Sequence, residues 1–255
     1  MIKTLYLIYQ ILIALPVMIV LTIITALVTM IGSIFNDRFW GYWPGMIWGR
    51  LFYIVFLIPV HVHGRENIMN GESYVVAANH QSYWDAFLMY GYLGIKFKWI
   101  MKKELGKVPF VGWACRMAGH IFIDRSSRVN SMESIRKAES QLKNGMSVVI
   151  FPEGTRTSDG RMARFKRGAF LISEELGLPI LPVAIDGNYT VMSRHSWKVT
   201  WHPVHITFLE PVMPKCEPQA TEQEMAKVMT ETSNLVYTKI NETLNKRGTD
   251  CQGLV

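Results

Sequence analysis

The sequence has no charged residue from Thr4 to Phe35, a run of 32 residues. This is longer than the roughly 20 apolar residues that one membrane span needs, and too long for the apolar core of a signal peptide. It also has no clear cleavage site of the small-x-small type, so we expect the segment to stay in the protein. The alternative is a pair of core helices in a soluble protein, where uncharged runs of this length are rare.

Cysteine is scarce, and the common hydrolytic motifs are missing. Cys115, Cys216 and Cys251 are widely separated and odd in number, which argues against a disulfide framework and fits a reducing compartment.

There is no G-x-S-x-G nucleophile elbow, no H-E-x-x-H and no P-loop. His61 and His63 share a predicted strand face but lack a third ligand. We therefore expect no metal site, and the usual signatures of serine and nucleotide hydrolysis are absent.

What the chain has in excess is apolar and basic residues. The hydrophobic fraction is 49%, the net charge is +7 and the sequence pI is about 9.3. A basic surface favours anionic partners, which include phospholipid headgroups, phosphate substrates, acidic carrier proteins and nucleic acid.

A second apolar segment, from Phe39 to Val60, follows the uncharged run and is interrupted by Pro44, Gly45 and Arg50. It begins with several aromatic residues of the kind that prefer the headgroup level of a membrane. We predict that residues 1–58 form a membrane-associated two-helix hairpin whose second helix lies in or near the interface. Lys3 and Arg38 flank the first helix almost symmetrically, so its orientation and whether it spans stay open.

Short β-type runs alternate with amphipathic helices after the hairpin, which predicts an α/β domain with a mixed sheet flanked by helices. The expected strands are 59–63, 71–78, 97–100, 121–123, 147–151, 180–185 and 199–209. Helices are expected after Ser82, over 131–143 and from Thr221 onward. We assign residues 59–246 to this domain and 247–255 to a loose tail.

His80 and Asp85 form the first candidate site, in Asn79-His80-Gln81-Ser82-Tyr83-Trp84-Asp85. His80 follows a strand, and Asp85 lies early in the next helix, close enough to hydrogen-bond the imidazole Nδ1. That bond would leave Nε2 free to accept a proton. Ser82-x-x-Asp85 is also a capping pattern, so Asp85 could instead only cap the helix. Because the sequence shows no motif for a protein nucleophile, the proton that His80 accepts is most simply that of a substrate hydroxyl.

The segment Phe151 to Ser158 is the second candidate. It leaves a buried-type strand and turns at Pro-Glu-Gly. Gly154 allows close approach of the backbone to a ligand, Arg156 offers a planar fork for phosphate oxygens, and Thr155 adds a hydroxyl. Glu153 could make an ion pair with the many neighbouring cations. An exposed basic loop is the alternative interpretation.

Two further cations are weaker candidates. Arg125 follows the predicted strand 121–123 and could bind phosphate or form a salt bridge with Asp124. Lys103 could supply another cation or belong to a solvated helix end.

Taken together, these segments resemble the bacterial 1-acyl-sn-glycerol-3-phosphate acyltransferases of the glycerolipid acyltransferase superfamily. His80 to Asp85 is similar to the family's H-x4-D block, and Phe151 to Arg156 to its F-P-E-G-T-R block. Gly119 to Arg125 and Leu178 to Val183 resemble its second and fourth blocks. Four blocks in order, behind a membrane hairpin, are far more specific than one H-x4-D.

The resemblance implies a function and a set of roles. His80 would be the general base oriented by Asp85, and Lys103, Arg125, Glu153, Gly154, Thr155 and Arg156 would bind the glycerol phosphate. The expected reaction moves an acyl chain from acyl-CoA or acyl-carrier protein to the sn-2 hydroxyl of lysophosphatidic acid, making phosphatidic acid for phospholipid synthesis. No metal or other cofactor and no nucleic acid is expected. The expected location is the cytoplasmic side of the bacterial inner membrane, against the phospholipid bilayer.

His120 departs from the family pattern, which has a small or apolar residue there, and its expected place beside the site bears on substrate preference. Alternatives remain open at this point. The same motifs would serve acylation of another lyso-lipid, such as an aminolipid or a lysophospholipid with a larger headgroup. A non-catalytic lipid-binding protein is a further alternative, but it would not need a histidine oriented as a base. A hydrolase would need the G-x-S-x-G nucleophile motif, which the sequence lacks.

Overall fold

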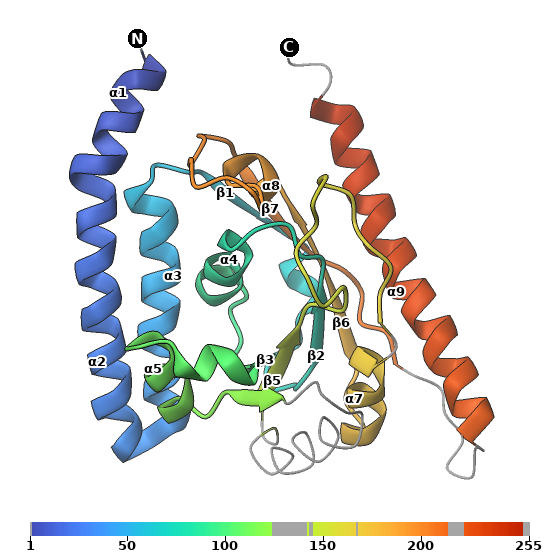
Figure 1. The fold of residues 1–255 in the computed structure, drawn as a ribbon. Coiled ribbons are helices and arrows are strands. Elements are labelled where there is room, and N and C mark those ends of the chain that lie inside the picture. Colours follow the sequence, from blue (N-terminus) through green and yellow to red (C-terminus); the bar gives the residue numbers. More distant parts are fainter. Residues whose placement is uncertain (1, 124–141, 143–144, 167, 214–221, 252–255) are drawn as a thin grey trace.

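Within the residues that the computed structural model describes (2–123, 142, 145–166, 168–213 and 222–251), a seven-stranded mixed sheet forms the centre of the fold (Figure 1). The strand order is β1-β7-β6-β2-β5-β3-β4, and only the β6–β7 pair is antiparallel. The strands are β1 Val60–His63, β2 Val75–Ala78, β3 Phe97–Lys102, β4 Ile121–Ile123, β5 Ser147–Ile150, β6 Ile180–Asp186 and β7 Val204–Phe208. The predicted mixed α/β fold is confirmed.

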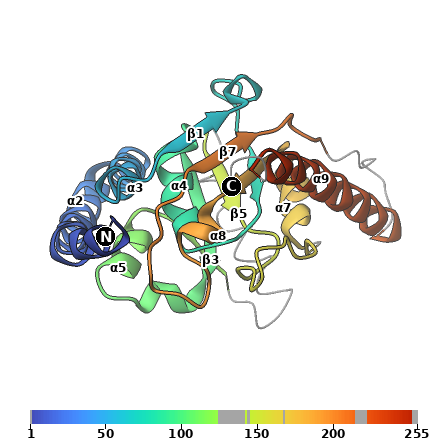
Figure 2. The same cartoon turned by 90° about the horizontal axis from the view of Figure 1, so that it is seen from above.

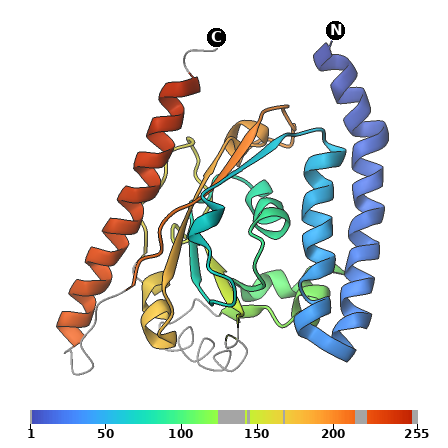
Figure 3. The same ribbon diagram turned by 180° about the vertical axis from the view of Figure 1, so that it is seen from behind.

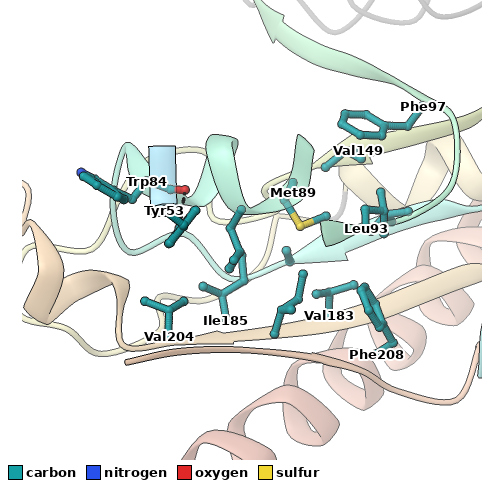
Figure 4. Close-up of a cluster of buried hydrophobic side chains, with 14 of the residues drawn as sticks. Tyr53, Trp84, Met89, Leu93, Phe97, Val149, Val183, Ile185, Val204 and Phe208 are labelled. Atoms are coloured by element: carbon teal, nitrogen blue, oxygen red, sulfur yellow. Dashed lines mark hydrogen bonds between the residues drawn. The ribbon is translucent and has the colours of Figure 1, made fainter. Parts of the chain in front are cut away.

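Helices cover both faces of the sheet, and the alternation of side chains along each strand divides the core between the faces. On one face, Val76, Val149 and Val183 pack with α3 (Trp43–Val55) and α4 (Trp84–Tyr92). On the other, Val75 and Val148 pack with α7 (Gly168–Leu176) and α9 (Glu222–Cys251). Figure 2 shows the two helical layers on either side of the sheet, and Figure 4 shows part of the first core cluster.

The N-terminal helical segment is nearly continuous from Ile2 to Trp40, through α1 (Ile2–Tyr9), a π-helical turn (Gln10–Ala14) and α2 (Leu15–Trp40). Asn36 leaves helical geometry, with φ −158° and ψ 96°, and its Oδ1 accepts the Phe39 N–H at 3.0 Å. The segment is long and apolar enough to cross a membrane, and only 17% of its most apolar stretch is buried. It lies alongside the domain, next to α3 (Figure 3).

The second helix of the hairpin, for which the sequence predicted a position in or near the membrane interface, packs on the α/β domain. α3 packs between α2 and α4. Tyr42, just before it, is 4% exposed, and the Trp48 indole N–H donates to the Thr22 hydroxyl at 2.9 Å. Both aromatic residues pack against protein: the Trp48 ring lies on Phe87 of α4, and the Tyr42 ring on Phe97 of β3.

Close approach of α3 and α4 depends on two facing glycines. A Cβ on Gly49 would lie 2.5 Å from the Phe87 carbonyl oxygen, and one on Gly91 would lie 2.8 Å from the Arg50 backbone nitrogen. Real Cβ atoms do not approach backbone atoms so closely, so the helix pair requires glycine at both positions.

The remaining described elements connect this framework. They are η2 (Arg65–Asn67), η3 (Lys103–Lys107), α5 (Val111–Met117) and α8 (Asn188–Val191). α9 continues to Cys251, so the structure has helix over residues 247–251, which the sequence assigned to a loose tail. The Arg247 guanidinium hydrogen-bonds the Thr207 hydroxyl of β7 at 3.1 Å, which fixes this end of the helix to the sheet. Most of the helix predicted over 131–143 lies outside the described residues.

Candidate active site

His80 and Asp85 lie between the end of β2 and the start of α4. The His80 Nδ1 is 2.9 Å from the Asp85 Oδ2, so the predicted hydrogen bond is present. The Asn79 side chain makes two hydrogen bonds to the backbone of Ile185, which hold the end of β2 against β6. The turn that carries His80 is therefore fixed by the sheet itself.

Asp85 both caps the helix and orients the histidine, so the two alternatives drawn from the sequence hold together. Its Oδ2 accepts the backbone N–H groups of Gln81 at 2.6 Å and Ser82 at 2.8 Å, besides the imidazole. Its Oδ1 accepts the Asn188 amide at 2.8 Å. All four partners are nitrogen donors, so the fully buried carboxylate acts only as an acceptor, which requires the Nδ1–H tautomer or the imidazolium of His80.

The imidazole ring lies flat on Phe151, with ring centroids 3.9 Å apart and planes 7° from parallel. Its Nε2 makes no hydrogen bond to any residue in the described part of the chain, and the side chain is 19% exposed. The ring is thus held on one face and at Nδ1 while Nε2 stays accessible. This is the arrangement a general base needs.

Glu153 holds the two motif segments together, although the sequence predicted that it binds the substrate phosphate. Its Oε1 accepts the His80 backbone N–H at 2.6 Å, and its Oε2 accepts the Ala163 N–H at 2.7 Å. The Thr157 N–H donates to the His80 carbonyl at 2.9 Å. Burial raises the pKa of Glu153, and the two N–H groups oppose that rise. A carboxylate so occupied and 3% exposed has little capacity left for a ligand.

The loop after Glu153 presents a guanidinium beside the histidine turn. Gly154 has φ +75°, a conformation that disfavours a side chain. The Arg156 guanidinium lies over the Tyr83 ring, 3.5 Å from its centroid, and its Nη1 is buried without a hydrogen-bond partner among the described residues. Since Tyr83 belongs to the turn between His80 and Asp85, the Arg156 guanidinium packs on the turn that carries the candidate base.

Arg194 is a further cation that no sequence motif marks. Its Nη1 donates to the Thr155 hydroxyl at 3.2 Å and to the Arg156 carbonyl at 3.0 Å. Thr155, a predicted phosphate ligand, thus contacts this second guanidinium, and it is exposed. Only the tertiary structure brings Arg194, which follows α8, to the Arg156 loop.

The remaining predicted phosphate ligands are less well defined. Lys103 begins η3 after the carboxyl end of β3, and its side chain is exposed. Because β2, β3, β5 and β6 run parallel, His80, Lys103, Glu153 and Asn188 all follow strand ends at one edge of the sheet. Arg125 lies outside the described residues.

His120 packs behind the site, not in it. Its Nδ1 accepts the Trp99 N–H at 3.2 Å, so its Nε2 carries the proton that the Tyr90 hydroxyl oxygen accepts at 2.5 Å. The Trp99 ring in turn packs on Phe151. Burial, with a smaller contribution from Lys98, lowers the pKa of His120 to about 3.

The buried His120 should make the protein sensitive to acid. The unfolded chain takes up a proton near pH 6.5, but the folded protein keeps His120 neutral down to about pH 3. The free energy of unfolding should therefore fall as the pH drops from 6.5 towards 3. His120→Gln should flatten this slope, measured as Tm between pH 7 and 4, and the exposed His195→Gln should not. Equal slopes in all three proteins would contradict the assignment.

Three other histidines lie together on β1 and β7. The His61 and His205 rings stack at 4.7 Å, and the His63 Nε2 is 3.2 Å from the His205 Nδ1. Burial and neighbouring cations lower the pKa of His205 to about 4. The described residues contain no group of three His, Cys, Asp or Glu side chains placed to hold a metal ion.

Comparison with known proteins points to the same segments of the chain as the geometry of the candidate site. The family model described as Acyltransferase matches residues 59–186, half of the chain, and covers His80, Asp85 and the whole Arg156 loop. The chain belongs to the acyltransferase family.

Individual relatives of this acyltransferase-family chain share the name of one activity. It is 33% identical over 144 residues to a chloroplastic 1-acyl-sn-glycerol-3-phosphate acyltransferase from Arabidopsis thaliana, a match covering 56% of this chain and 40% of that protein. It is 39% identical over 134 residues to the 1-acyl-sn-glycerol-3-phosphate acyltransferase of Pseudomonas aeruginosa, covering 52% and 51%. The chain thus spans about two fifths of the length of the chloroplastic relatives that it matches.

A solved structure matches over nearly the full length. The crystal structure of the 1-acyl-sn-glycerophosphate acyltransferase PlsC from Thermotoga maritima superposes with a TM-score of 0.71 at 28% sequence identity. The match covers 95% of this chain and 98% of that one. It therefore includes most of the N-terminal helical segment as well as the α/β domain.

Proposed function

We propose that this protein transfers an acyl chain from an acyl thioester, acyl-CoA or acyl-carrier protein, to the sn-2 hydroxyl of 1-acyl-glycerol-3-phosphate, making phosphatidic acid for phospholipid synthesis. The observation that carries the proposal is the accessible Nε2 of His80, a histidine held by Asp85 in the turn on which Arg156 packs, where the Arg156 Nη1 has no hydrogen-bond partner among the described residues. The activity for which the bacterial and chloroplastic relatives are named supports the choice of acceptor.

The reaction follows from the groups present. The His80 Nε2 takes the proton of the acceptor hydroxyl while its oxygen attacks the thioester carbonyl carbon. A C–O bond forms and the C–S bond breaks, and the departing thiolate takes the proton back from the imidazolium. Asp85 stabilises the transient positive charge on the ring, as the aspartate does in hydrolase triads. The nucleophile belongs to the substrate, so the reaction proposed here needs no protein hydroxyl and no metal.

Arg156 is the proposed anchor for the acceptor's phosphate. A buried guanidinium N–H without a partner costs free energy, and a phosphate oxygen at Nη1 would remove that cost. Stacking on Tyr83 fixes the plane of the guanidinium, and Arg194 adds a second positive charge to the same loop. An anchored phosphate lowers the entropic cost of bringing the neighbouring hydroxyl to His80.

The proposed location is the cytoplasmic face of the bacterial inner membrane. Large apolar side chains on the N-terminal helix are exposed, among them Leu12 at 69%, Ile31 at 60% and Phe35 at 82%. Leaving them in water is unfavourable, whereas a bilayer would bury them. Because the helix lies alongside the domain (Figures 1 and 3), a bilayer that receives it would also lie close to the domain, from which the lysolipid could enter.

Purified protein in liposomes, a labelled acyl-CoA or acyl-carrier protein, and a panel of lyso-lipids test the proposal. We expect transfer to lysophosphatidic acid in preference to lysophospholipids with larger headgroups. Arg156→Lys should raise KM for lysophosphatidic acid about tenfold, because lysine lacks the planar fork, and Arg161→Lys in the same loop should not.

The panel separates the alternatives. Absence of transfer to every lyso-lipid with both donors would overturn the enzymatic assignment. Transfer only to acceptors without a phosphomonoester would leave an acyltransferase with a different acceptor. An unchanged KM in Arg156→Lys would remove Arg156 from phosphate recognition.

A further inference from the structure

A chain of buried hydrogen bonds leads from the hairpin to the candidate base. The hydroxyl of Tyr53, on α3, lies 3.0 Å from the Asn188 Oδ1 and 3.0 Å from the Trp84 carbonyl oxygen. The Asn188 Nδ2 donates to the Asp85 Oδ1 at 2.8 Å. Tyr53, Asn188 and Asp85 are all 0% exposed. Figure 4 shows Tyr53 next to Trp84 at one end of the core cluster.

The direction of each hydrogen bond follows from the chemistry of the groups. Burial raises the pKa of Tyr53 well above its ordinary value, so its hydroxyl stays protonated and donates. The single hydroxyl proton is shared between two acceptors at the same distance, the Asn188 Oδ1 and the Trp84 carbonyl oxygen. The Asn188 Nδ2 faces Asp85, because an amide turned the other way would place two oxygens in contact, one of them anionic. The Asp85 carboxylate thus sets the orientation of the amide, and the Tyr53 hydroxyl holds the Oδ1 of that amide in place.

Asn188 makes the one hydrogen bond to the Asp85 Oδ1 that is found among the described residues. The Oδ2 has three partners, two of them on the backbone of the same turn. Rotation of the carboxylate about its Cβ–Cγ bond would exchange the two oxygens and disturb the contact with the His80 Nδ1. A donor at Oδ1 opposes that rotation.

We propose that Tyr53 and Asn188 are positioning residues for the catalytic base. They fix the orientation of the Asp85 carboxylate, and through it the imidazole of His80. The second helix of the hairpin is then part of the catalytic machinery as well as a means of attachment. This inference rests on the proposed role of His80.

The geometry also connects the base to the apolar N-terminal helix. α3 packs directly on α2, and the Tyr9 hydroxyl donates to the Val55 carbonyl at 2.7 Å, close to Tyr53 on the same helix. A displacement of the hairpin would therefore change the position of Tyr53. Only two hydrogen bonds separate that hydroxyl from the carboxylate that holds His80.

Tyr53→Phe and Asn188→Ala test the inference, with Tyr42→Phe as the matched control. Tyr42 is also buried at the hairpin, but its hydroxyl has no hydrogen-bond partner in the described part of the chain. Both test variants should lower kcat about threefold to tenfold, the effect of one lost hydrogen bond, with KM for the acceptor nearly unchanged. Tyr42→Phe should keep wild-type kcat.

A second measurement reports on the base without requiring turnover. The His80 ring can be titrated by NMR, its signals being identified by their loss in His80→Gln. Asn188→Ala removes the donor that holds the Asp85 carboxylate against the imidazole. The His80 titration midpoint should therefore differ from that of the wild type, with a smaller difference in Tyr53→Phe.

The outcomes distinguish this inference from the proposed function. An active wild type whose His80 titration and kcat are unaffected by both test variants would overturn the positioning role alone. A lowered Tm with no change in the titration would likewise indicate a purely structural role. An equal loss of kcat in Tyr42→Phe would also overturn the positioning role. A wild type without transfer to any lyso-lipid would instead overturn the proposed function, whatever the titration shows.

Discussion

His80→Ala is expected to lower kcat/KM for acyl transfer by about 10²–10⁴-fold, the usual contribution of a positioned general base. The fold should survive, because the turn is held by the His80 backbone: its N–H donates to Glu153, and its carbonyl accepts from Thr157. Alanine keeps both groups and removes only the ring that stacks on Phe151. Transfer of a labelled acyl chain to lysophosphatidic acid, followed beside Tm, measures the two effects separately.

The matched control for this prediction is His61→Ala, on the edge strand β1. His61 also stacks on an aromatic ring, that of His205, but takes no part in the proposed chemistry. It should retain wild-type kcat/KM. Full transfer by His80→Ala would mean that the acceptor hydroxyl is activated by another group, and the mechanism given above would be wrong.

Gly49→Val should destabilise the protein by about 3 kcal/mol, which corresponds to a fall in Tm of roughly 10 °C. Helix propensity alone predicts that this substitution stabilises the protein, since valine is a better helix former than glycine. The contact outweighs propensity because the new Cβ would meet the Phe87 carbonyl oxygen at 2.5 Å, and a backbone atom cannot move aside without displacing α4. Thermal unfolding followed by circular dichroism measures the change.

Ile47→Val is the control for this second prediction. Ile47 lies on the same helix and is 53% exposed, so a valine there tests the residue type without the helix contact, and Tm should hardly change. Because α3 also carries Tyr53, Gly49→Val should reduce kcat in the protein that remains folded. A Tm equal to that of the wild type would show that α3 and α4 can separate without loss, and that the close helix contact is not needed.

The hairpin would thus have a second role besides the membrane attachment proposed for it. Its first helix keeps apolar side chains exposed, whereas its second contributes Tyr53, fully buried, to the core that lies under α4. A boundary drawn at residue 58 from composition alone separates this helix from the domain with which it packs.

The sequence by itself predicted the seven strands in their order along the chain and the helices α4 and α9, and it singled out the candidate base. Strands such as Ser147–Ile150 are short apolar runs bounded by turn residues, and such local patterns are readable without a structure. His80 and Asp85 lie five positions apart, so one strand–helix turn is enough to bring them together. Arg156 follows a strand in the same way, and its chemistry is a local property.

Only the tertiary structure decided what Glu153 contacts and which distant residues join the site. Glu153 among cations looked like a phosphate ligand or an ion pair, but the loop folds back and gives its carboxylate two backbone N–H donors. Asn188 and Tyr53 lie 103 and 32 positions from Asp85 and carry no motif, and Arg194 is likewise unmarked. Their contacts depend on the parallel order β6-β2-β5 and on the Gly49–Gly91 approach, and neither is a property of any local stretch of sequence.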